Sequence, residues 1–295
     1  MPSPDPNRPA DLLQHFGREG LKRFERASWV GANLPDGARI ALETWGVPRS
    51  VAPYFEAPQP GEPVALGVFA AHSSRPRAHP AMEAWPRVGS DGLANLCVRP
   101  DGAVQAVLLE DVGDDMFVNT DVSTLNASLL ALDRAQPLIA TSAGLTEAAA
   151  VFRDLYMELR RIDPVAFSDR EGWWPRVLDD VRHTLNFPFS AAFEYVDEAG
   201  SKHVVTESTG PGQPHPEELV WRRLAADGVD SSQVRRVYSE LAPCLMPGHY
   251  CAVWLQDMFP HAEFTHSFDY GATAESREEG LKQLIIHTAQ QARSR

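Results

Sequence analysis

Cysteine is scarce in this chain, with three copies among 295 residues. So few thiols argue against a small secreted scaffold held together by disulfides. The first residues also lack the positively charged segment followed by an apolar run that a secretory signal requires. We therefore expect a cytoplasmic protein in a reducing compartment, where two nearby cysteines more often bind a metal or take part in catalysis than form a disulfide.

Long apolar runs and basic clusters are missing as well. No apolar segment approaches the ~20 residues that a membrane-spanning helix needs, which predicts no membrane contact. The formal net charge is −13, and acidic residues outnumber basic ones in both halves of the chain. This charge argues against a strong, non-specific polynucleotide binder, but it is compatible with a nucleotide or a single flipped base in a small pocket.

The first part of the chain mixes helical and strand patterns. A β-hairpin is predicted over LANLCVRPDGAVQAVLLED, with its turn at Pro100-Asp101-Gly102, and FVNTDVSTLNASLLALDRA predicts a helix capped by Asp121 or Ser123. Further helices are predicted at four places, which are Pro9 to Ala27, ARIALETWGVP, Leu145 to Leu159 and EGWWPRVLDDVRHTL. We therefore predict an α+β domain over residues 1–186.

Three segments of this domain carry a family resemblance. ARIALETWGVP, FVNTDVSTLNASLLAL (117–132) and RRIDPVAFSDREGWWPRVLDDV (160–181) resemble the SUKH superfamily, proteins best known as immunity partners of bacterial toxins. The resemblance covers most of residues 10–186. It implies a recognition or inhibitory module without chemistry of its own, which would bind a protein partner. Trp173 and Trp174 are interpreted as core or inter-domain packing rather than as a ligand platform.

Residues 187–295 have a clearer order, β-β-α-β-α-β-α, which predicts an α/β domain with a layered sheet and flanking helices. The break in pattern at LNFPFS places the boundary near Phe187. A capping box from Ser276 to Glu279 is expected to open the last helix. The predicted strands are SAAFEYVD, KHVVTEST, VRRVYSEL and AEFTHSF, and the predicted helices are PEELVWRRLAADG, YCAVWLQDMF and the segment from Ser276 onward.

Two of the three cysteines stand close together in SELAPCLMPGHYC. Cys244 follows a predicted strand, Cys251 begins a predicted helix, and His215 begins the helix before. Helix N-termini that follow neighbouring strands tend to lie on the same side of a sheet, so one imidazole and two thiolates could converge there. They would make three ligands for a tetrahedral Zn²⁺ with one open position, as hydrolytic zinc sites have.

The sequence H-x-E followed by P-C-x-x-C is a signature of zinc-dependent nucleobase deaminases. This chain has His215-Pro216-Glu217 and Pro243-Cys244, but six residues, not two, separate Cys244 from Cys251. A type II turn at Pro247-Gly248 could bring the longer loop back to the metal. His249, two residues before Cys251, is then an alternative third ligand.

The second domain also resembles the bacterial deaminases of polymorphic toxin systems, members of the cytidine-deaminase-like superfamily. The resemblance rests on HPEE (215–218), VYSELAPC (237–244), GHYCAVWL (248–255) and HSFDYG (266–271). It implies zinc ligation by His215, Cys244 and Cys251 and proton transfer by Glu217. It also implies that Ser239 and Glu240 line or brace the pocket. Tyr250, Phe268 and Tyr270 could stack on a base, although packing explains each of them equally well.

We therefore predict zinc-dependent hydrolytic deamination of a nucleobase, with cytosine in a nucleotide or single-stranded nucleic acid as the favoured substrate, in a toxin–immunity or defence system. The alternative is a non-catalytic immunity or interaction protein with a structural zinc site on a degenerate deaminase fold. In that case His249 would be the fourth ligand, because a closed structural site needs four. A third reading makes both cysteines plain core residues.

Overall fold

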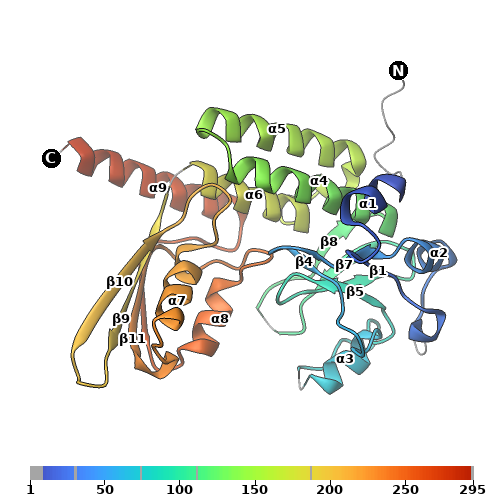
Figure 1. The fold of residues 1–295 in the computed structure, drawn as a ribbon, viewed down its shortest axis with the longest axis horizontal. Helices are drawn as coiled ribbons and strands as arrows, with labels where there is room; N and C mark the ends of the chain where they lie inside the picture. Colours follow the sequence, from blue (N-terminus) through green and yellow to red (C-terminus); the bar gives the residue numbers. More distant parts are fainter. Residues whose placement is uncertain (1–8, 30–31, 74, 111, 187, 294–295) are drawn as a thin grey trace. The chain divides into compact units, whose positions relative to one another are not determined.

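The structure is a computed structural model that describes residues 9–29, 32–73, 75–110, 112–186 and 188–293. Backbone contacts divide the chain into two compact units, which are treated separately below (Figure 1). Unit 1 comprises residues 1–137 and 151–177, and unit 2 comprises residues 138–150 and 178–295. The boundary expected near Phe187 falls on a residue outside the described ones, and the division into domains 1–186 and 187–295 stays a prediction.

Unit 1 contains an antiparallel six-stranded sheet with the order β3-β4-β5-β6-β7-β8 and a two-stranded sheet, β1-β2. Helices α4, α5 and α6 each have residues in both units. The strands are β1 Leu21–Lys22, β2 Val47–Pro48, β3 Ser50–Val51, β4 Phe55–Glu56, β5 Arg87–Ser90, β6 Asn95–Val98, β7 Val104–Val107 and β8 Met116–Asn119. The helices that precede strand β9 in the chain are α1 Pro9–Phe16, α2 Asp36–Thr44, α3 Leu66–His72, α4 Val122–Ala140, α5 Leu145–Ile162 and α6 Trp173–Asn186.

Several predicted elements of unit 1 are confirmed. The predicted hairpin is the antiparallel pair β6-β7, with Val98 opposite Val104 and Gly102 at φ +93°, a conformation that favours glycine. The cap of α4 is Asp121, whose Oδ1 accepts a hydrogen bond from the backbone N–H of Thr124 at 2.8 Å. Cys97 is fully buried on β6, where it packs as a small core residue.

The helix predicted from Pro9 to Ala27 is wrong in its second half. Helix α1 ends at Phe16, and the chain continues as β1 and a 3₁₀ turn at Arg26–Trp29. Gly17 has φ +68°, which is a left-handed conformation outside the helix. At Gly20 a Cβ atom would lie 2.2 Å from the carbonyl oxygen of Phe16. The apolar spacing continued past these two glycines, and the glycines decided where the helix ends.

The two tryptophans that begin α6 are buried in unit 1, which confirms the packing interpretation. Trp173 Nε1–H donates to Asp91 Oδ2 at 2.7 Å, and Trp174 Nε1–H donates to Asn119 Oδ1 at 2.9 Å. Both indole rings are fully buried, with their centroids 4.8 Å apart in an edge-to-face arrangement. Each ring therefore combines a large apolar contact with a satisfied N–H group.

We expect Trp174→Phe to lower the free energy of unfolding of unit 1 by about 2–3 kcal/mol. The substitution leaves a cavity, and the buried side-chain amide oxygen of Asn119 loses the hydrogen bond from the indole. Urea unfolding followed by circular dichroism would measure the change. Trp45→Phe is the matched control, since Trp45 is 38% exposed. Equal transition midpoints for the two variants would contradict the expectation.

Unit 2 is built on a four-stranded mixed sheet with the order β10-β9-β11-β12. Strand β9 is antiparallel to both β10 and β11, and β11 is parallel to β12. The strands are β9 Ser190–Val196, β10 Lys202–Ser208, β11 Val234–Leu241 and β12 Glu263–Phe268, and the helices are α7 Pro216–Ala226, α8 Cys251–Met258 and α9 Ala274–Arg293. The predicted order β-β-α-β-α-β-α is confirmed.

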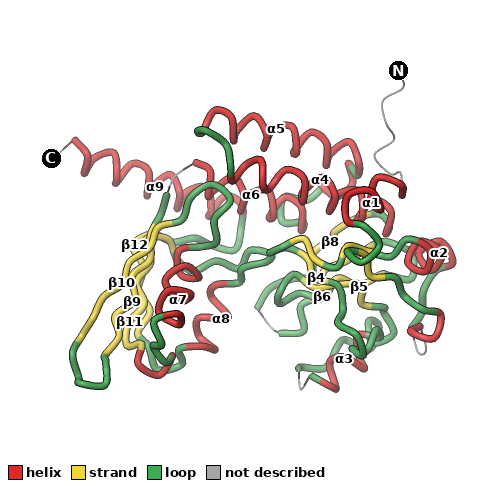
Figure 2. Tube along the Cα trace, viewed as in Figure 1, coloured by secondary structure: helices red, strands yellow, loops and turns green. Residues whose placement is uncertain are grey.

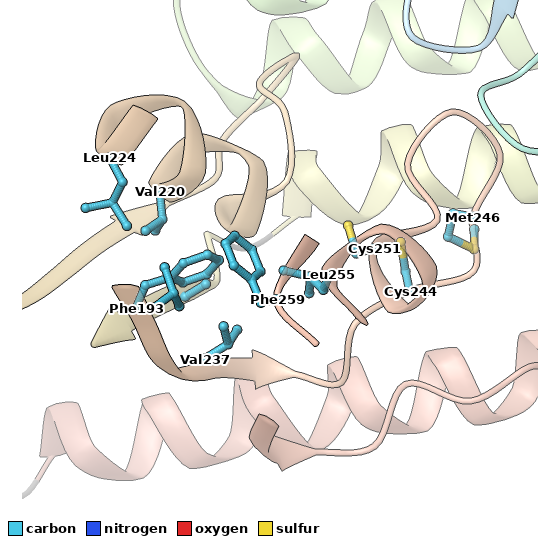
Figure 3. Close-up of a cluster of buried hydrophobic side chains, with 11 residues drawn as sticks. Phe193, Val220, Leu224, Val237, Cys244, Met246, Cys251, Leu255 and Phe259 are labelled. Carbon is cyan, nitrogen blue, oxygen red and sulfur yellow. The ribbon is translucent and has the colours of Figure 1, made fainter. Parts of the chain in front are cut away.

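Helices lie on both faces of this sheet (Figures 2 and 3). Helices α7 and α8 cover one face, where their side chains join β9 and β11 in a core around Phe193, Val237 and Phe259. Helix α9 packs on the other face through Leu281 and Leu284. Figure 3 shows that the sulfur atoms of Cys244 and Cys251 lie together at one end of the core. The layered α/β arrangement expected of the second domain is thus present.

The capping box predicted for α9 is displaced by three residues. The helix begins at Ala274, and the cap is Thr273, whose Oγ1 accepts from the Ser276 N–H at 3.3 Å. Ser276 Oγ in turn accepts from the Thr273 N–H at 3.1 Å. The reciprocal pattern is that of a capping box, with serine in the position that glutamate usually occupies. Among the described helices of the chain, none is long and apolar enough to span a membrane.

Candidate active site

Three side chains of unit 2 meet where α7 and α8 begin. Strands β10 and β11 both run antiparallel to β9, so their carboxyl ends lie at the same edge of the sheet. The helix that follows each strand starts at this edge, with His215 as the N-cap of α7 and Cys251 as the first residue of α8. The two strands are separated by β9 and are not neighbours, but the predicted convergence occurs because their directions agree.

The loop between the cysteines returns the chain to this edge. His249 N–H donates to the Met246 carbonyl at 3.1 Å, and Gly248 has φ +82°, as a type II turn requires at its third residue. Tyr250 follows in the left-handed region at φ 44°, which few residues other than glycine adopt. The Ala252 N–H then donates to the Cys244 carbonyl at 3.0 Å, closing the loop. The six intervening residues therefore loop out, as predicted for Pro247-Gly248.

His215, Cys244 and Cys251 form a buried group whose chemistry fits a zinc ion. Nδ1 of His215 lies 3.4 Å from Sγ of Cys244 and 3.4 Å from Sγ of Cys251. Tetrahedral zinc with ordinary Zn–N and Zn–S bonds separates a nitrogen from a sulfur ligand by about 3.6 Å. One atom from each residue lies within 4.8 Å of the others, so the group could hold a metal. One nitrogen and two sulfurs are a donor set that favours zinc.

The protonation of this group also suits a metal ligand. Burial alone would raise the pKa of Cys244, but a hydrogen bond from Cys251 and the nearby His215 hold it well below its ordinary value. Burial alone would lower the pKa of His215, but Asp180 and Cys244 raise it well above its ordinary value. The side chains thus form a thiolate–imidazolium pair without a metal. A metal would replace the proton on Nδ1, since ligands bind in their deprotonated form.

A carboxylate from α6 completes the surroundings of His215. Asp180, 2% exposed, accepts at Oδ1 from His215 Nε2–H at 2.9 Å, and its Oδ2 lies 3.2 Å from Nε2 of His249. The rings of His215 and His249 are stacked, with centroids 3.9 Å apart and an angle of 6°. Asp180, His215 and His249 form a second group that could hold a metal, and it shares His215 with the first.

His249, the alternative third ligand, points its ring nitrogens at carboxylates. Its Nδ1 lies 3.2 Å from Glu218 Oε1, while its Nε2 faces Asp180. Burial and His215 lower the pKa of His249, but Asp180 and Glu218 outweigh them and raise it to about 9. Since both nitrogens of His249 are directed at carboxylates, its ring is not aimed at the cysteine sulfurs, which favours Cys251 over His249 as the third ligand.

Glu217 lies beside a small cavity at the same edge. Glu217 is 3% exposed, and burial raises its pKa to about 7. The cavity, about 20 Å³ in volume, is lined by Asp180, His183, Phe189, His215, Glu217, Leu241, Ala242, Cys244 and Tyr270. This volume suffices for about one water molecule. His215 and Glu217 reach one space although they are two residues apart, because His215 precedes the helix and Glu217 lies in its first turn.

Of the five predicted pocket residues, Tyr270 alone lines this cavity, and its hydroxyl is hydrogen-bonded to His183 Nδ1. Glu240 instead accepts hydrogen bonds from the backbone N–H of Ser190 at 2.6 Å and from its hydroxyl at 2.8 Å, which braces β9. Ser239 is fully buried, and its Oγ has no hydrogen-bond partner among the described residues. Tyr250 is buried in the loop, and Phe268 packs beside the α9 cluster. A substrate role for these residues stays a prediction.

Asp180, His183 and Glu218 surround the metal-capable group but are not among the site residues predicted from the sequence. Asp180 and His183 lie in LDDVRH, which was assigned to the first domain, so nothing connected them with the cysteines. An acid and a histidine three residues apart on a helix lie on one face, which was the available signal. Glu218 stands next to Glu217 in the motif HPEE, and the motif by itself assigns it no role.

Two family models match the chain over consecutive segments. The model described as SUKH-4 immunity protein matches residues 8–180, and the model described as Xanthomonas-like deaminase matches residues 188–287. Neither a curated protein nor a solved structure matches the chain. Both resemblances stated from the sequence are confirmed by these matches.

Proposed function

Because the chain belongs to the SUKH-4 immunity protein family and carries a deaminase domain at residues 188–287, we propose that it is a zinc-dependent hydrolase that deaminates a nucleobase. The favoured substrate is cytosine in a nucleotide or single-stranded nucleic acid. His215, Cys244 and Cys251 would hold the zinc, and Glu217 would carry protons. The SUKH-4 segment would bind a protein partner in a toxin–immunity or defence system.

One observation carries the proposal: a nitrogen and two sulfurs converge beside a buried carboxyl group at one small cavity. The Nδ1–Sγ distances of 3.4 Å fit zinc, and His215, Cys244 and Glu217 line the same cavity. Three protein ligands leave the fourth position of a tetrahedral metal open, as in hydrolytic zinc enzymes. Plain core packing of the cysteines would not require a histidine ring nitrogen facing both sulfurs.

The reaction exchanges an exocyclic amino group for oxygen. Zinc, when bound, acts as a Lewis acid and lowers the pKa of water to about 7. Glu217 would take a proton from that water and deliver it to the ring nitrogen next to the attacked carbon. The water oxygen would then add to this carbon, which becomes tetrahedral. Glu217 would take the remaining proton from the added hydroxyl group and pass it to the amino group, and the carbon–nitrogen bond would break as the carbonyl forms. Water and the base thus give the carbonyl product and ammonia.

The cavity volume favours a second candidate function. A space of about 20 Å³ holds about one water molecule and is too small for a base, which is several times larger. A site without room for a substrate suits a non-catalytic immunity or interaction protein with a structural zinc ion. In the enzyme, the residues over the cavity would have to move before a substrate enters.

The two candidates differ in ammonia release. We expect the zinc-loaded full chain to release ammonia from at least one member of a panel of nucleosides, nucleotides and single-stranded oligonucleotides that contain cytosine, adenine or guanine. Treatment with a zinc chelator should abolish the release, and added zinc should restore it. Stoichiometric zinc without ammonia release from any member would favour the interaction protein instead.

A further inference from the structure

The deaminase family model begins at residue 188, yet a residue before it contacts the metal group. Asp180 lies on α6, eight positions earlier, and it is the last residue that the immunity family model matches. By backbone contacts it belongs to unit 2, with His215 and both cysteines. The segment that carries the deaminase motif therefore does not supply all of the side chains around its metal ligands.

The contacts of His215 show what Asp180 does. The ring has two nitrogens, and Nε2–H donates to Asp180 Oδ1 at 2.9 Å while Nδ1 faces the two sulfurs. An acceptor at Nε2 keeps the proton on that atom and leaves the Nδ1 lone pair for a metal. Metal-binding histidines generally have a carboxylate or carbonyl partner of this kind on the second nitrogen.

The orientation of the ring is fixed from more than one side. Asp180 bridges two parallel rings, since its Oδ1 contacts His215 and its Oδ2 contacts His249. His249 covers one face of the His215 ring at 3.9 Å, and its far nitrogen is held by Glu218 at 3.2 Å. A buried carboxylate is costly unless it is paired, and these two histidines are the partners that pair it.

We propose that Asp180 is the positioning residue of the metal centre, and that α6 is therefore part of the deaminase active unit. This inference rests on the metal site of the proposed function. Asp180 acts through His215: it sets which nitrogen carries the proton and holds the ring in the plane that aims Nδ1 at the sulfurs. The segment matched by the deaminase family alone would lack this partner.

Zinc affinity of the full chain tests the proposal. We expect Asp180→Asn to bind zinc about 10–100-fold more weakly than the parent in a chelator competition, the loss typical of a removed carboxylate partner. Asp180→Ala should lose at least as much. Asp197→Asn is the matched control, because Asp197 Oδ2 also pairs with a histidine, His203 Nε2 at 2.8 Å, on the exposed β9-β10 hairpin. Its zinc affinity should equal that of the parent.

If Asp180 had a merely structural role, Asp180→Asn would lower the melting temperature but leave the zinc affinity of the folded chain unchanged. Equal zinc affinities of this variant and the parent therefore overturn the proposal. If the parent binds zinc and Asp180→Asn binds it equally well, this inference fails and the proposed function stands. If the parent binds no zinc, both fail.

A measurement on the parent covers the case in which the variants do not fold. In proton–nitrogen correlation NMR of the zinc-loaded chain, His215 should carry its proton on Nε2 and none on Nδ1. A proton on Nδ1 would overturn the proposal without any substitution.

Discussion

Glu217→Gln should bind zinc as the parent does and lose nearly all deaminase activity. Glutamine has the shape of glutamate but cannot take a proton from water, so the reaction loses its proton carrier. Loss of a general acid–base group typically lowers the rate ~10²–10⁴-fold, and we expect kcat to fall by at least this much. Because glutamine fills the same space and Glu217 is not in the group of His215 and the two cysteines, the fold and the metal should persist.

Rates of ammonia release and zinc content, measured on the same preparation, check this expectation. Glu207→Gln is the control, since Glu207 lies in the same unit and forms an ion pair with Arg223 at 2.7 Å on the surface. Its activity and zinc content should match those of the parent. Deamination by Glu217→Gln at the parental rate would show that another group moves the protons.

Cys251→Ser should lose the metal itself. Serine replaces a thiolate with a hydroxyl group that is not deprotonated at neutral pH, so zinc keeps only two good protein ligands. The loss of affinity should exceed the ~10–100-fold that removal of an outer partner costs. The parent should contain about one zinc per chain, and Cys251→Ser should retain little after dialysis against a chelator.

The third cysteine supplies the control for this loss. Cys97 is fully buried on β6 of unit 1, and it belongs to neither metal-capable group of the described residues. Cys97→Ser should therefore keep about one zinc per chain, even if its stability falls. Added zinc should raise the melting temperature of the parent and of Cys97→Ser but not that of Cys251→Ser, because a ligand stabilises only a state that binds it. Equal zinc contents in all three proteins would remove Cys251 from the ligand set.

The local signals for the site were strong because they depend on residue type and short spacing. His215-Pro216-Glu217 places a proposed ligand and a buried carboxyl at a helix start, and Pro247-Gly248 indicates the turn that brings the cysteine loop back. The order of strands and helices then predicts that the helices after β10 and β11 begin at the same edge of the sheet. These features follow from turn chemistry and periodicity, which a single sequence shows.

Contacts across long stretches of sequence could not be predicted in this way. Asp180 lies 35 residues before His215, and no periodicity relates α6 to the start of α7. The His215–His249 stack depends on how the six-residue loop folds back, which is a matter of packing. In unit 1, α1 ends although the apolar pattern continues, because Gly17 adopts a left-handed conformation and the carbonyl of Phe16 occupies the space that a side chain at Gly20 would need.

Oxygen incorporation from water tests the central claim most directly. The zinc-loaded full chain is incubated in water labelled with the heavy isotope oxygen-18, together with the substrate from which it releases most ammonia. The mass of the product is then measured by mass spectrometry. Hydrolytic deamination predicts one heavy oxygen atom in the base for each ammonia released, and none when Glu217→Gln replaces the parent. Ammonia without heavy oxygen in the base, or no ammonia from any nucleobase compound, would contradict the assignment of this chain as a zinc-dependent nucleobase deaminase.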